Sequence, residues 1–441
     1  MRRRDLLRLT GIVPAATLVS WLAACDGEPI RTEEVGSGPR DLLLVRTTGG
    51  LALVDANLGR VVVGPRAGVT TWGGTSYVVG EAGAGRTTVE IARTSRSRLY
   101  RAEVGGVWQP RVISPEADMV ALADVTRESA SPYLPHGRAT TTIVVVGPQG
   151  ERGRFELAGC LEPEAFSAMG DYLYLLDYLP PEAPDHYRVR MLNLGTGVVE
   201  HLLTRDKTLV PTGAEEEMRG EGRQAVYVPS QRFLFTLYTH QPDHQHTRDL
   251  LGARSDAPAK DSASGPWPAL QTESKAPDVH AFVHSLNLEQ SFAYCVDLPA
   301  PFGENPAEGH VIAVDRNRID PIVLDTTSGA LAELDGVGLT VRGVSALPPM
   351  AQAGPASAVL NGLLYLGRGT AVRVVLLEAK QVLHEFVVPA PVRGIGVSPN
   401  RQRLWVGQPD TVVALDAESG AALASVPVPG LLGLDQVIAK N

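Results

Sequence analysis

Apolar segments alternate with short polar turns along most of the chain. In four places an apolar run enters a turn in which glycine follows Asp or Asn by four residues, beginning at Asp55, Asn193, Asp325 and Asp416. The Asp or Asn side chain can accept backbone hydrogen bonds at the start of a turn, and glycine takes the positive φ that closes it. Each of these places therefore predicts a β-hairpin.

A second pattern, an apolar strand, a polar turn and another apolar strand, occurs at residues 112–120, 165–175 and 395–406. Joined to the hairpins, it gives units of four strands, with almost no helical periodicity. The units lie near residues 41–64, 69–104, 112–157, 166–203, 223–299, 309–347, 356–388 and 395–428.

Two units are incomplete or ambiguous. The first lacks an inner strand, which residues 434–438 near the C-terminus can supply. In the sixth, the turn from Asp325 to Gly329 fits either of two hairpins.

Residues 395–428 resemble the YVTN-type β-propeller repeat, with Val397, Ser398, Pro399 and Asn400 standing where that family has a Ser-Pro-Asp-Gly turn. Weaker copies extend over residues 41–430. The resemblance implies an all-β fold, a single β-propeller of four-stranded blades closed by the C-terminal strand, because an open ring would expose unpaired strand edges. We count eight blades, with seven as the alternative. The propeller fold alone does not identify a ligand or a reaction, because propellers serve as enzymes, binding proteins and scaffolds.

The N-terminus has the layout of an export signal. A basic start is followed by an uncharged, mostly apolar run at residues 9–24, whose 16 residues fall short of the roughly 20 needed to cross a bilayer. Arg3 and Arg4 begin a segment that resembles the twin-arginine export motif. Residues 22–25 resemble the lipobox of bacterial lipoproteins, in which Cys25 would be acylated; an ordinary secretory peptide is the alternative.

These features predict three regions: a lipoprotein signal peptide at 1–24, a tether at 25–40 and a propeller at 41–441. The propeller contains an insertion at about 239–279, whose Ala, Ser, Asp, Pro and Lys content predicts mobility. The lipobox resemblance implies a protein held by lipid on the outer side of the cytoplasmic membrane or elsewhere in the cell envelope.

The net charge of the chain indicates which classes of partner it can bind. Residues 1–24 hold four arginines and one aspartate, so their removal changes the formal net charge from −9 to −12. An acidic surface repels phosphate backbones, which argues against nucleic acid as a partner.

After Cys25 the sequence contains two more cysteines, Cys160 and Cys295. They could form a disulfide outside the cytoplasm, but the sequence does not show whether they are close enough.

Three consecutive units have long connections between their second and third strands, at residues 124–140, 177–187 and 239–279. In a propeller these connections emerge on one face, and loops of this length are uncommon unless they are functional or disordered. Insertions without a ligand are the alternative. The predicted ligand-binding residues in these connections are Tyr133, His136, Arg138, Tyr178, Asp185, His186 and Trp267.

The third connection also holds three histidines within seven residues: His240, His244 and His246. Imidazole suits a divalent metal such as zinc, copper or nickel. Pro242, however, prevents a regular helix from aligning His240 with His244. No other cofactor is expected.

No motif in the sequence requires a catalytic function. Residues 80–87 have the spacing of a phosphate-binding loop, but they run into a predicted strand rather than a helix.

We expect a binding protein that uses its long loops to recognise an envelope protein, a peptide or a small ligand. One alternative is an exported hydrolase that resembles propeller lactonases, with Asp177 and Glu164 as candidate carboxylates. Another is a structural envelope protein. The oligomeric state is open.

Overall fold

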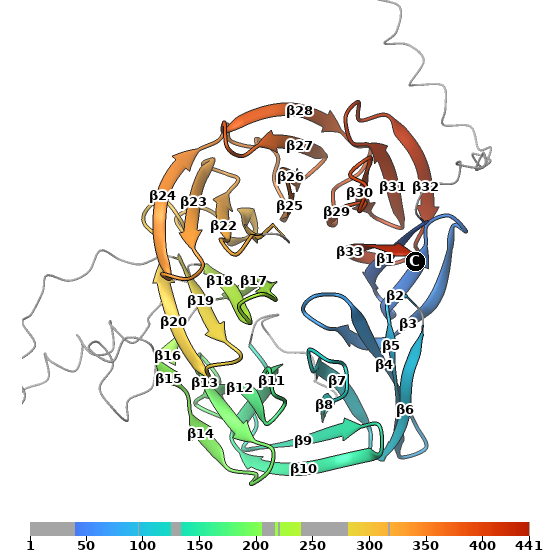
Figure 1. The fold of residues 1–441 in the computed structure, drawn as a ribbon, viewed down its shortest axis with the longest axis vertical. Coiled ribbons are helices and arrows are strands. Elements are labelled where there is room, and N and C mark those ends of the chain that lie inside the picture. Colours follow the sequence, from blue (N-terminus) through green and yellow to red (C-terminus); the bar gives the residue numbers. More distant parts are fainter. Residues whose placement is uncertain are drawn as a thin grey trace, which may run out of the picture. The chain divides into compact units, whose positions relative to one another are not determined.

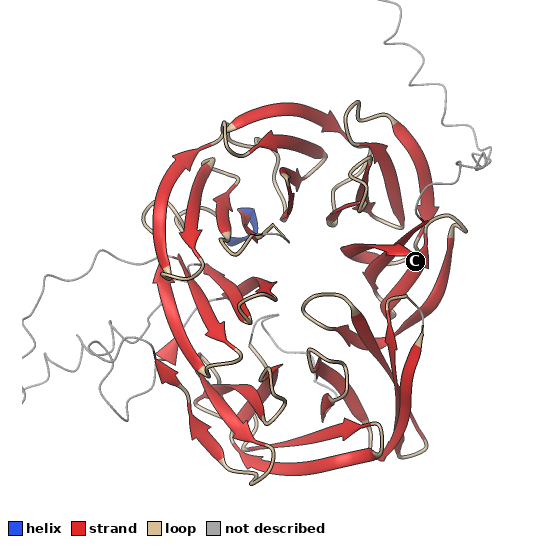
Figure 2. Ribbon diagram, in the orientation of Figure 1, coloured by secondary structure: helices blue, strands red, loops and turns tan. Residues whose placement is uncertain are grey.

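The computed structural model describes residues 40–95, 97–124, 134–204, 217–218, 221–239, 281–315 and 318–440. The chain divides into two compact units, Met1–Gly38 and Pro39–Asn441, and every described residue belongs to the second. This unit consists of β-strands, and its described part contains one short 3₁₀ helix, η1 (Ala307–Gly309; Figure 2). In the described residues no helix has the length and apolar character needed to span a membrane.

The described strands form a ring of eight blades (Figure 1). Seven sheets are hydrogen-bonded, and the seven-stranded one combines two blades that share β3 (Arg60–Thr70). The first part of β3 pairs with β2, whereas residues 67–70 pair with β4. The predicted fold class is therefore confirmed, with eight blades rather than seven.

The first four blades follow the predicted units. Blade 1 contains β33 (Leu431–Lys440), β1 (Arg40–Thr47), β2 (Gly50–Asp55) and the start of β3. Blade 2 contains the end of β3, β4 (Ser76–Gly83), β5 (Arg86–Arg93) and β6 (Arg98–Gly105). Blade 3 contains β7 (Trp108–Ile113), β8 (Val120–Asp124), β9 (Thr140–Gly147) and β10 (Gly150–Ala158). Blade 4 contains β11 (Cys160–Phe166), β12 (Tyr172–Leu179), β13 (His186–Asn193) and β14 (Val199–His201).

The remaining blades complete the ring. Blade 5 contains β17 (Glu221–Val228), β18 (Phe233–Thr239), β19 (Ala281–Asn287) and β20 (Phe292–Asp297). Blade 6 contains β21 (His310–Ala313), β22 (Ile322–Asp325), β23 (Ala330–Asp335) and β24 (Thr340–Ala346). Blade 7 contains β25 (Ala356–Asn361), β26 (Leu363–Arg368), β27 (Ala371–Leu376) and β28 (Gln381–Val387). Blade 8 contains β29 (Ile395–Val397), β30 (Arg403–Gln408), β31 (Thr411–Asp416) and β32 (Ala422–Pro427).

Blades 4 and 5 are additionally joined by two short strands. β15 (Leu203–Thr204) leaves blade 4 and pairs in parallel with β20 of blade 5. β16 (Glu217–Met218) then pairs with β13 of blade 4 before the chain enters β17. β15 thus adds a strand to the sheet of blade 5, and β16 adds one to the sheet of blade 4.

Antiparallel pairing gives the ring two distinct faces. Turns from first to second strands and from third to fourth strands lie on one face, here called the turn face. Connections from second to third strands, and from one blade to the next, lie on the opposite face, here called the loop face. Both ends of the described chain are on the turn face, since Arg40 pairs with Lys440 and Ala56 N–H donates to the Asp41 carbonyl at 3.1 Å.

Serine side chains shape three turns on the turn face. The Ser114 hydroxyl oxygen accepts from the Met119 backbone N–H at 3.0 Å, and the Ser167 oxygen accepts from that of Tyr172 at 3.0 Å. In the repeat that was clearest in the sequence, the Ser398 oxygen accepts from the Arg403 N–H at 3.0 Å. These bonds close the turn that each polar segment predicted.

Ring closure follows the sequence prediction. β33 pairs with β1 and supplies the inner strand that blade 1 lacks. Leu431, Leu434 and Val437 of β33 are buried. The Trp405 indole N–H of blade 8 donates to the buried Asp41 carboxylate at 2.9 Å, which links the last blade to the first.

The sixth blade shows which of the two possible hairpins contains the turn from Asp325 to Gly329. Asp325 to Gly329 joins β22 to β23, so this turn lies on the loop face, unlike those that begin at Asp55, Asn193 and Asp416. The turn between β23 and β24 instead begins at Asp335, whose carboxylate accepts from the backbone N–H groups of Val337 at 2.9 Å and Gly338 at 2.7 Å.

Candidate functional site on the loop face

The loop-face connections of blades 3 and 4 lie against each other. The Arg138 backbone N–H donates to the Pro181 carbonyl at 2.7 Å. A Cβ atom at Gly137 would overlap the carbonyl of Glu182, so the two backbones approach too closely for any side chain there. The structure thus brings together two of the loops that the sequence singled out.

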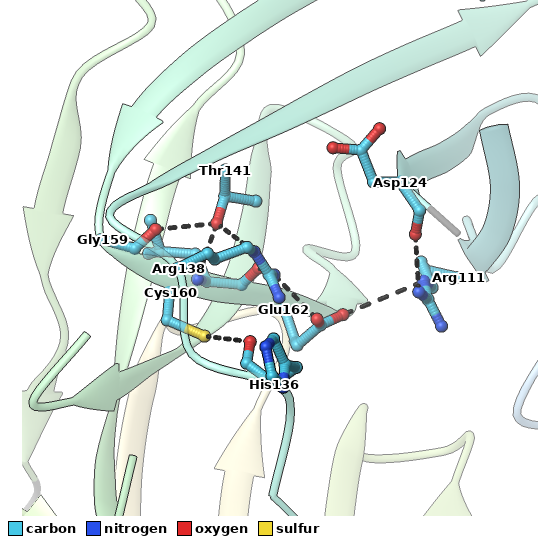
Figure 3. Close-up of polar contacts among 9 residues, drawn as sticks. Arg111, Asp124, His136, Arg138, Thr141, Gly159, Cys160 and Glu162 are labelled. Carbon is cyan, nitrogen blue, oxygen red and sulfur yellow. Dashed lines mark hydrogen bonds and ion pairs between the residues drawn. The ribbon is translucent and has the colours of Figure 1, made fainter. Parts of the chain in front are cut away.

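Arg138 fastens its loop to blade 4 through its guanidinium group (Figure 3). Nη2 donates to the Leu161 carbonyl at 2.6 Å and to the Glu162 carboxylate at 2.7 Å, and Nε donates to the Thr141 hydroxyl at 2.8 Å. These charge-assisted bonds orient the guanidinium toward the protein. Arg138 therefore organises the loop.

Glu162 lies between two arginines. Its second carboxylate oxygen is 3.9 Å from Nε of Arg111, which lies at a β-bulge in the inner strand β7 (Figure 3). Nη2 of Arg111 donates to the Asp124 carbonyl at 2.8 Å, at the point where the long connection of blade 3 begins. Through Arg111 at its start and Arg138 near its end, the long connection of blade 3 is linked to the Glu162 carboxylate.

The loop surface itself carries acidic and imidazole groups. His136, Glu182 and Asp185 are exposed, and Asp124 is exposed at the start of the first connection. The Asp185 carboxylate contacts Nδ1 of His186, whose side chain is 23% exposed. Carboxylates are the predominant charge offered to solvent by these residues.

The second connection is shorter than predicted. Strands β12 and β13 pair as far as Leu179 and His186, so only residues 180–185 form the loop. Asp177 is 6% exposed and forms ion pairs with Arg188 at 2.9 Å and Arg190 at 3.5 Å. Its carboxylate is therefore held within blade 4, because the cross-strand partner of Asp177 is Arg188.

Tyr178 lies in the interior rather than in an exposed loop. Its ring centroid is 5.4 Å from that of Tyr187, which lies 5.6 Å from that of Tyr238 in blade 5. Burial raises the pKa of Tyr178 well above its usual range, with smaller contributions from Tyr238 and Glu164. Tyr178 therefore packs between blades 4 and 5.

Burial also shifts the pKa values of Glu164 and His284 in this region. Glu164 lies at a β-bulge of the inner strand β11, and burial raises the pKa of its carboxyl group to about 7. His284 of β19 is 5% exposed, and burial lowers the pKa of its imidazole to about 4. Within the described structure, Nε2 of His284 has no hydrogen-bond partner. Sequence reasoning missed His284, because a single histidine in a strand gives no local signal.

The two cysteines of the propeller are free thiols. Cys160 and Cys295 are both buried between blades 4 and 5, in one apolar cluster. Sγ of Cys160 lies 3.7 Å from the His136 carbonyl, and Sγ of Cys295 lies 3.8 Å from Sδ of Met218. The disulfide left open by the sequence is not formed.

Several predicted site residues lie outside the described residues: Arg3, Arg4, Cys25, Tyr133, His240, His244, His246 and Trp267. Their assignments stay predictions. In the part of the chain that the structure describes, no three His, Cys, Asp or Glu side chains form a group that could hold a metal ion.

Neither protein-family models nor curated protein sequences match this chain. Among solved structures, it is similar to AztD from Citrobacter koseri at 12% identity and TM-score 0.49, covering 90% of this chain and 97% of that chain. Sqt1 of Saccharomyces cerevisiae matches at 10% identity and TM-score 0.46, covering 82% and 84%. Hydrazine synthase of Kuenenia stuttgartiensis matches at 13% identity and TM-score 0.39, covering 78% and 91%. These likenesses concern the fold alone.

Proposed function

We propose that this protein is an exported lipoprotein, anchored through Cys25, whose propeller binds a protein or peptide partner through the loop face of blades 3 and 4. The basic start, the short apolar run and the lipobox-like residues 22–25 support the export and anchoring. The contacts between the two loops support the binding.

The observation that carries the binding proposal is that these loops are fastened together. Gly137 packs on the backbone of Glu182, and Arg138 joins its loop to Pro181, Leu161 and Glu162. A surface that is ordered before it meets a partner loses less conformational entropy on binding.

The charge of this surface indicates the chemistry of its partner. Asp124, Glu182 and Asp185 are exposed, while Arg111 and Arg138 are bonded to groups of the protein. Complementary potentials steer and orient binding partners. We therefore expect a partner with basic or hydrogen-bond-donating groups at its contact surface.

The test is a combined His136→Ala, Glu182→Ala, Asp185→Ala variant, used as bait in quantitative capture from envelope extracts. The matched control is Glu116→Ala, Glu289→Ala, which removes exposed charges from the turn face. We expect a protein that the wild type and the control recover and the loop variant loses, with unchanged thermal unfolding of all three. Equal recovery by all three baits would contradict the proposal and favour a structural envelope protein.

A second candidate is a hydrolase that acts on lactones, favoured by Glu164. A carboxyl group with a pKa of about 7 can exchange protons near neutral pH, as general acid–base catalysis requires. Purified protein would be assayed on lactones with and without added divalent metal, beside Glu164→Gln. Turnover that disappears in Glu164→Gln would support the hydrolase, and its absence from the wild type in both conditions would exclude these substrates.

A further inference from the structure

We infer that the turn face of the propeller lies against the lipid surface, so that the loop face points away from the membrane. This inference rests on the proposed lipid anchor. Its two supports are the position where the chain enters the ring and the side chains that the turn face exposes.

The chain enters the ring on the turn face. β1 is the second strand of blade 1, and second strands run from the turn face to the loop face. The bond from Ala56 N–H to the Asp41 carbonyl has direct counterparts in blades 4 and 8, where Leu194 donates to Asp171 and Ala417 donates to Gln402. All three bonds join the start of a second strand to the turn between the third and fourth strands.

The distance to the anchor is limited by the chain itself. Residues 26–39 separate Cys25 from Arg40, and fourteen residues span at most about 50 Å even when fully extended. Acylation of Cys25 would therefore keep Arg40, at the edge of the turn face, within about 50 Å of the bilayer.

Apolar side chains are exposed at the turns of this face in blades 1, 2, 4 and 6. They are Leu58 (51% exposed), Trp72 (38%), Met169 (82%), Val198 (55%) and Val337 (53%). Apolar and aromatic side chains are favourable at the boundary between headgroups and acyl chains. Among the described connections of the loop face, one large apolar side chain is exposed, Val107 (50%), while Val387 (82%) and Leu432 (55%) are exposed at strand ends on the same face.

Both faces of the ring expose charged side chains. The exposed carboxylates of Asp124, Glu182 and Asp185 lie on the loop face. Anionic lipid headgroups attract basic groups and repel carboxylates. The turn face also exposes carboxylates, at Glu116, Asp171, Glu289 and Glu418, beside Arg93, Arg318 and Arg401, so charge does not distinguish the two faces.

The experiment places single thiols at matched positions. Val337→Cys and Met169→Cys lie on the turn face, and Val107→Cys and Val387→Cys, with 50% and 82% exposure in the wild type, lie on or at the edge of the loop face. Each thiol is labelled with a polarity-sensitive fluorophore. The native Cys160 and Cys295 are buried and should not react in the folded protein.

Each labelled variant is measured on vesicles that contain nitroxide-labelled lipid, both as the acylated protein and as residues 26–441 held by an N-terminal polyhistidine tag on nickel-chelating lipid. We expect several times stronger quenching at positions 337 and 169 than at 107 and 387. Equal quenching on the two faces, or stronger quenching on the loop face, would overturn the inference.

The proposed anchor is tested separately by detergent partitioning of the wild type and Cys25→Ala. If the wild type carries no lipid but the tagged form shows the expected pattern, the anchor is wrong and the lipid preference of the turn face stands. If the wild type is acylated but the pattern is absent, the orientation alone is wrong.

Discussion

At the scale of single residues, the boundary between blades 4 and 5 contains two groups whose pKa shifts have opposite effects on stability. The pKa of His284 is lowered to about 4, so the folded protein resists its protonation. The pKa of Glu164 is raised to about 7, so the folded protein favours its protonation. Lowering the pH therefore destabilises the fold through His284 and stabilises it through Glu164.

The contribution of His284 can be isolated with His284→Leu. Above the ordinary histidine pKa of 6.5, both the folded and the unfolded wild type hold a neutral imidazole. Between pH 6.5 and 4 only the unfolded state takes up the proton, so the wild type loses roughly 3 kcal/mol of unfolding free energy through this group. Urea unfolding of both proteins at pH 7.5 and pH 4.5 measures the difference. A wild type and a variant with the same pH dependence would contradict the expectation.

Single residues also show where sequence reasoning fails. His136 and Asp185 were predicted as ligand-binding residues because they lie in long connections, and both side chains are exposed. Tyr178 and Arg138 were predicted for the same reason, but Tyr178 packs against Tyr187 and Tyr238, and Arg138 bonds to Leu161 and Glu162. Those partners lie on other strands or in another blade, and no local pattern encodes such contacts.

At the scale of elements, the two fastened loops behave as one unit, and Gly137 is their point of closest approach. An alanine side chain at this position must displace the backbone of Glu182. We expect Gly137→Ala to cost about 1–3 kcal/mol of unfolding free energy, as overpacking commonly does, and to weaken partner capture.

Gly73→Ala is the matched control, because a Cβ atom there meets no other atom within 4 Å. Urea unfolding and the capture assay, run on both variants and the wild type, check the expectation. If Gly137→Ala behaves like Gly73→Ala in both measurements, the loops do not depend on their close contact.

The hairpins were predictable because their turns are built from local interactions. Asp55, Asn193 and Asp416 each accept bonds from backbone N–H groups two and three residues ahead, as their spacing to glycine indicated. The sixth blade was ambiguous because the turns that begin at Asp325 and Asp335 use the same chemistry. Only pairing with β21 and β24 distinguishes them.

At the scale of the whole molecule, one strand from the end of the chain closes the ring. Removing residues 431–441 would expose the inner edge of β1 and the apolar surface that Leu431, Leu434 and Val437 cover. Exposed strand edges pair with other chains. We expect the truncated protein to unfold at a lower temperature and to self-associate, measured by circular dichroism and by light scattering after size-exclusion chromatography.

Leu432→Ser is the control for that truncation. Leu432 belongs to the same strand, but its side chain is 55% exposed, so its loss should leave the ring closed. A truncated protein that stays monomeric with the stability of Leu432→Ser would show that β33 is dispensable. The number of blades and their closure were predictable because each unit repeats the same hairpins and the first unit visibly lacked a strand.

The pairing of β1 with β33 also determines when blade 1 can be completed during synthesis. β1 is among the first strands of the propeller to leave the ribosome, and its inner neighbour is the last. Blade 1 must therefore wait for nearly the entire polypeptide before it can be completed. The other seven blades have all their strands before β33 is made, so completion of blade 1 and closure of the ring come last.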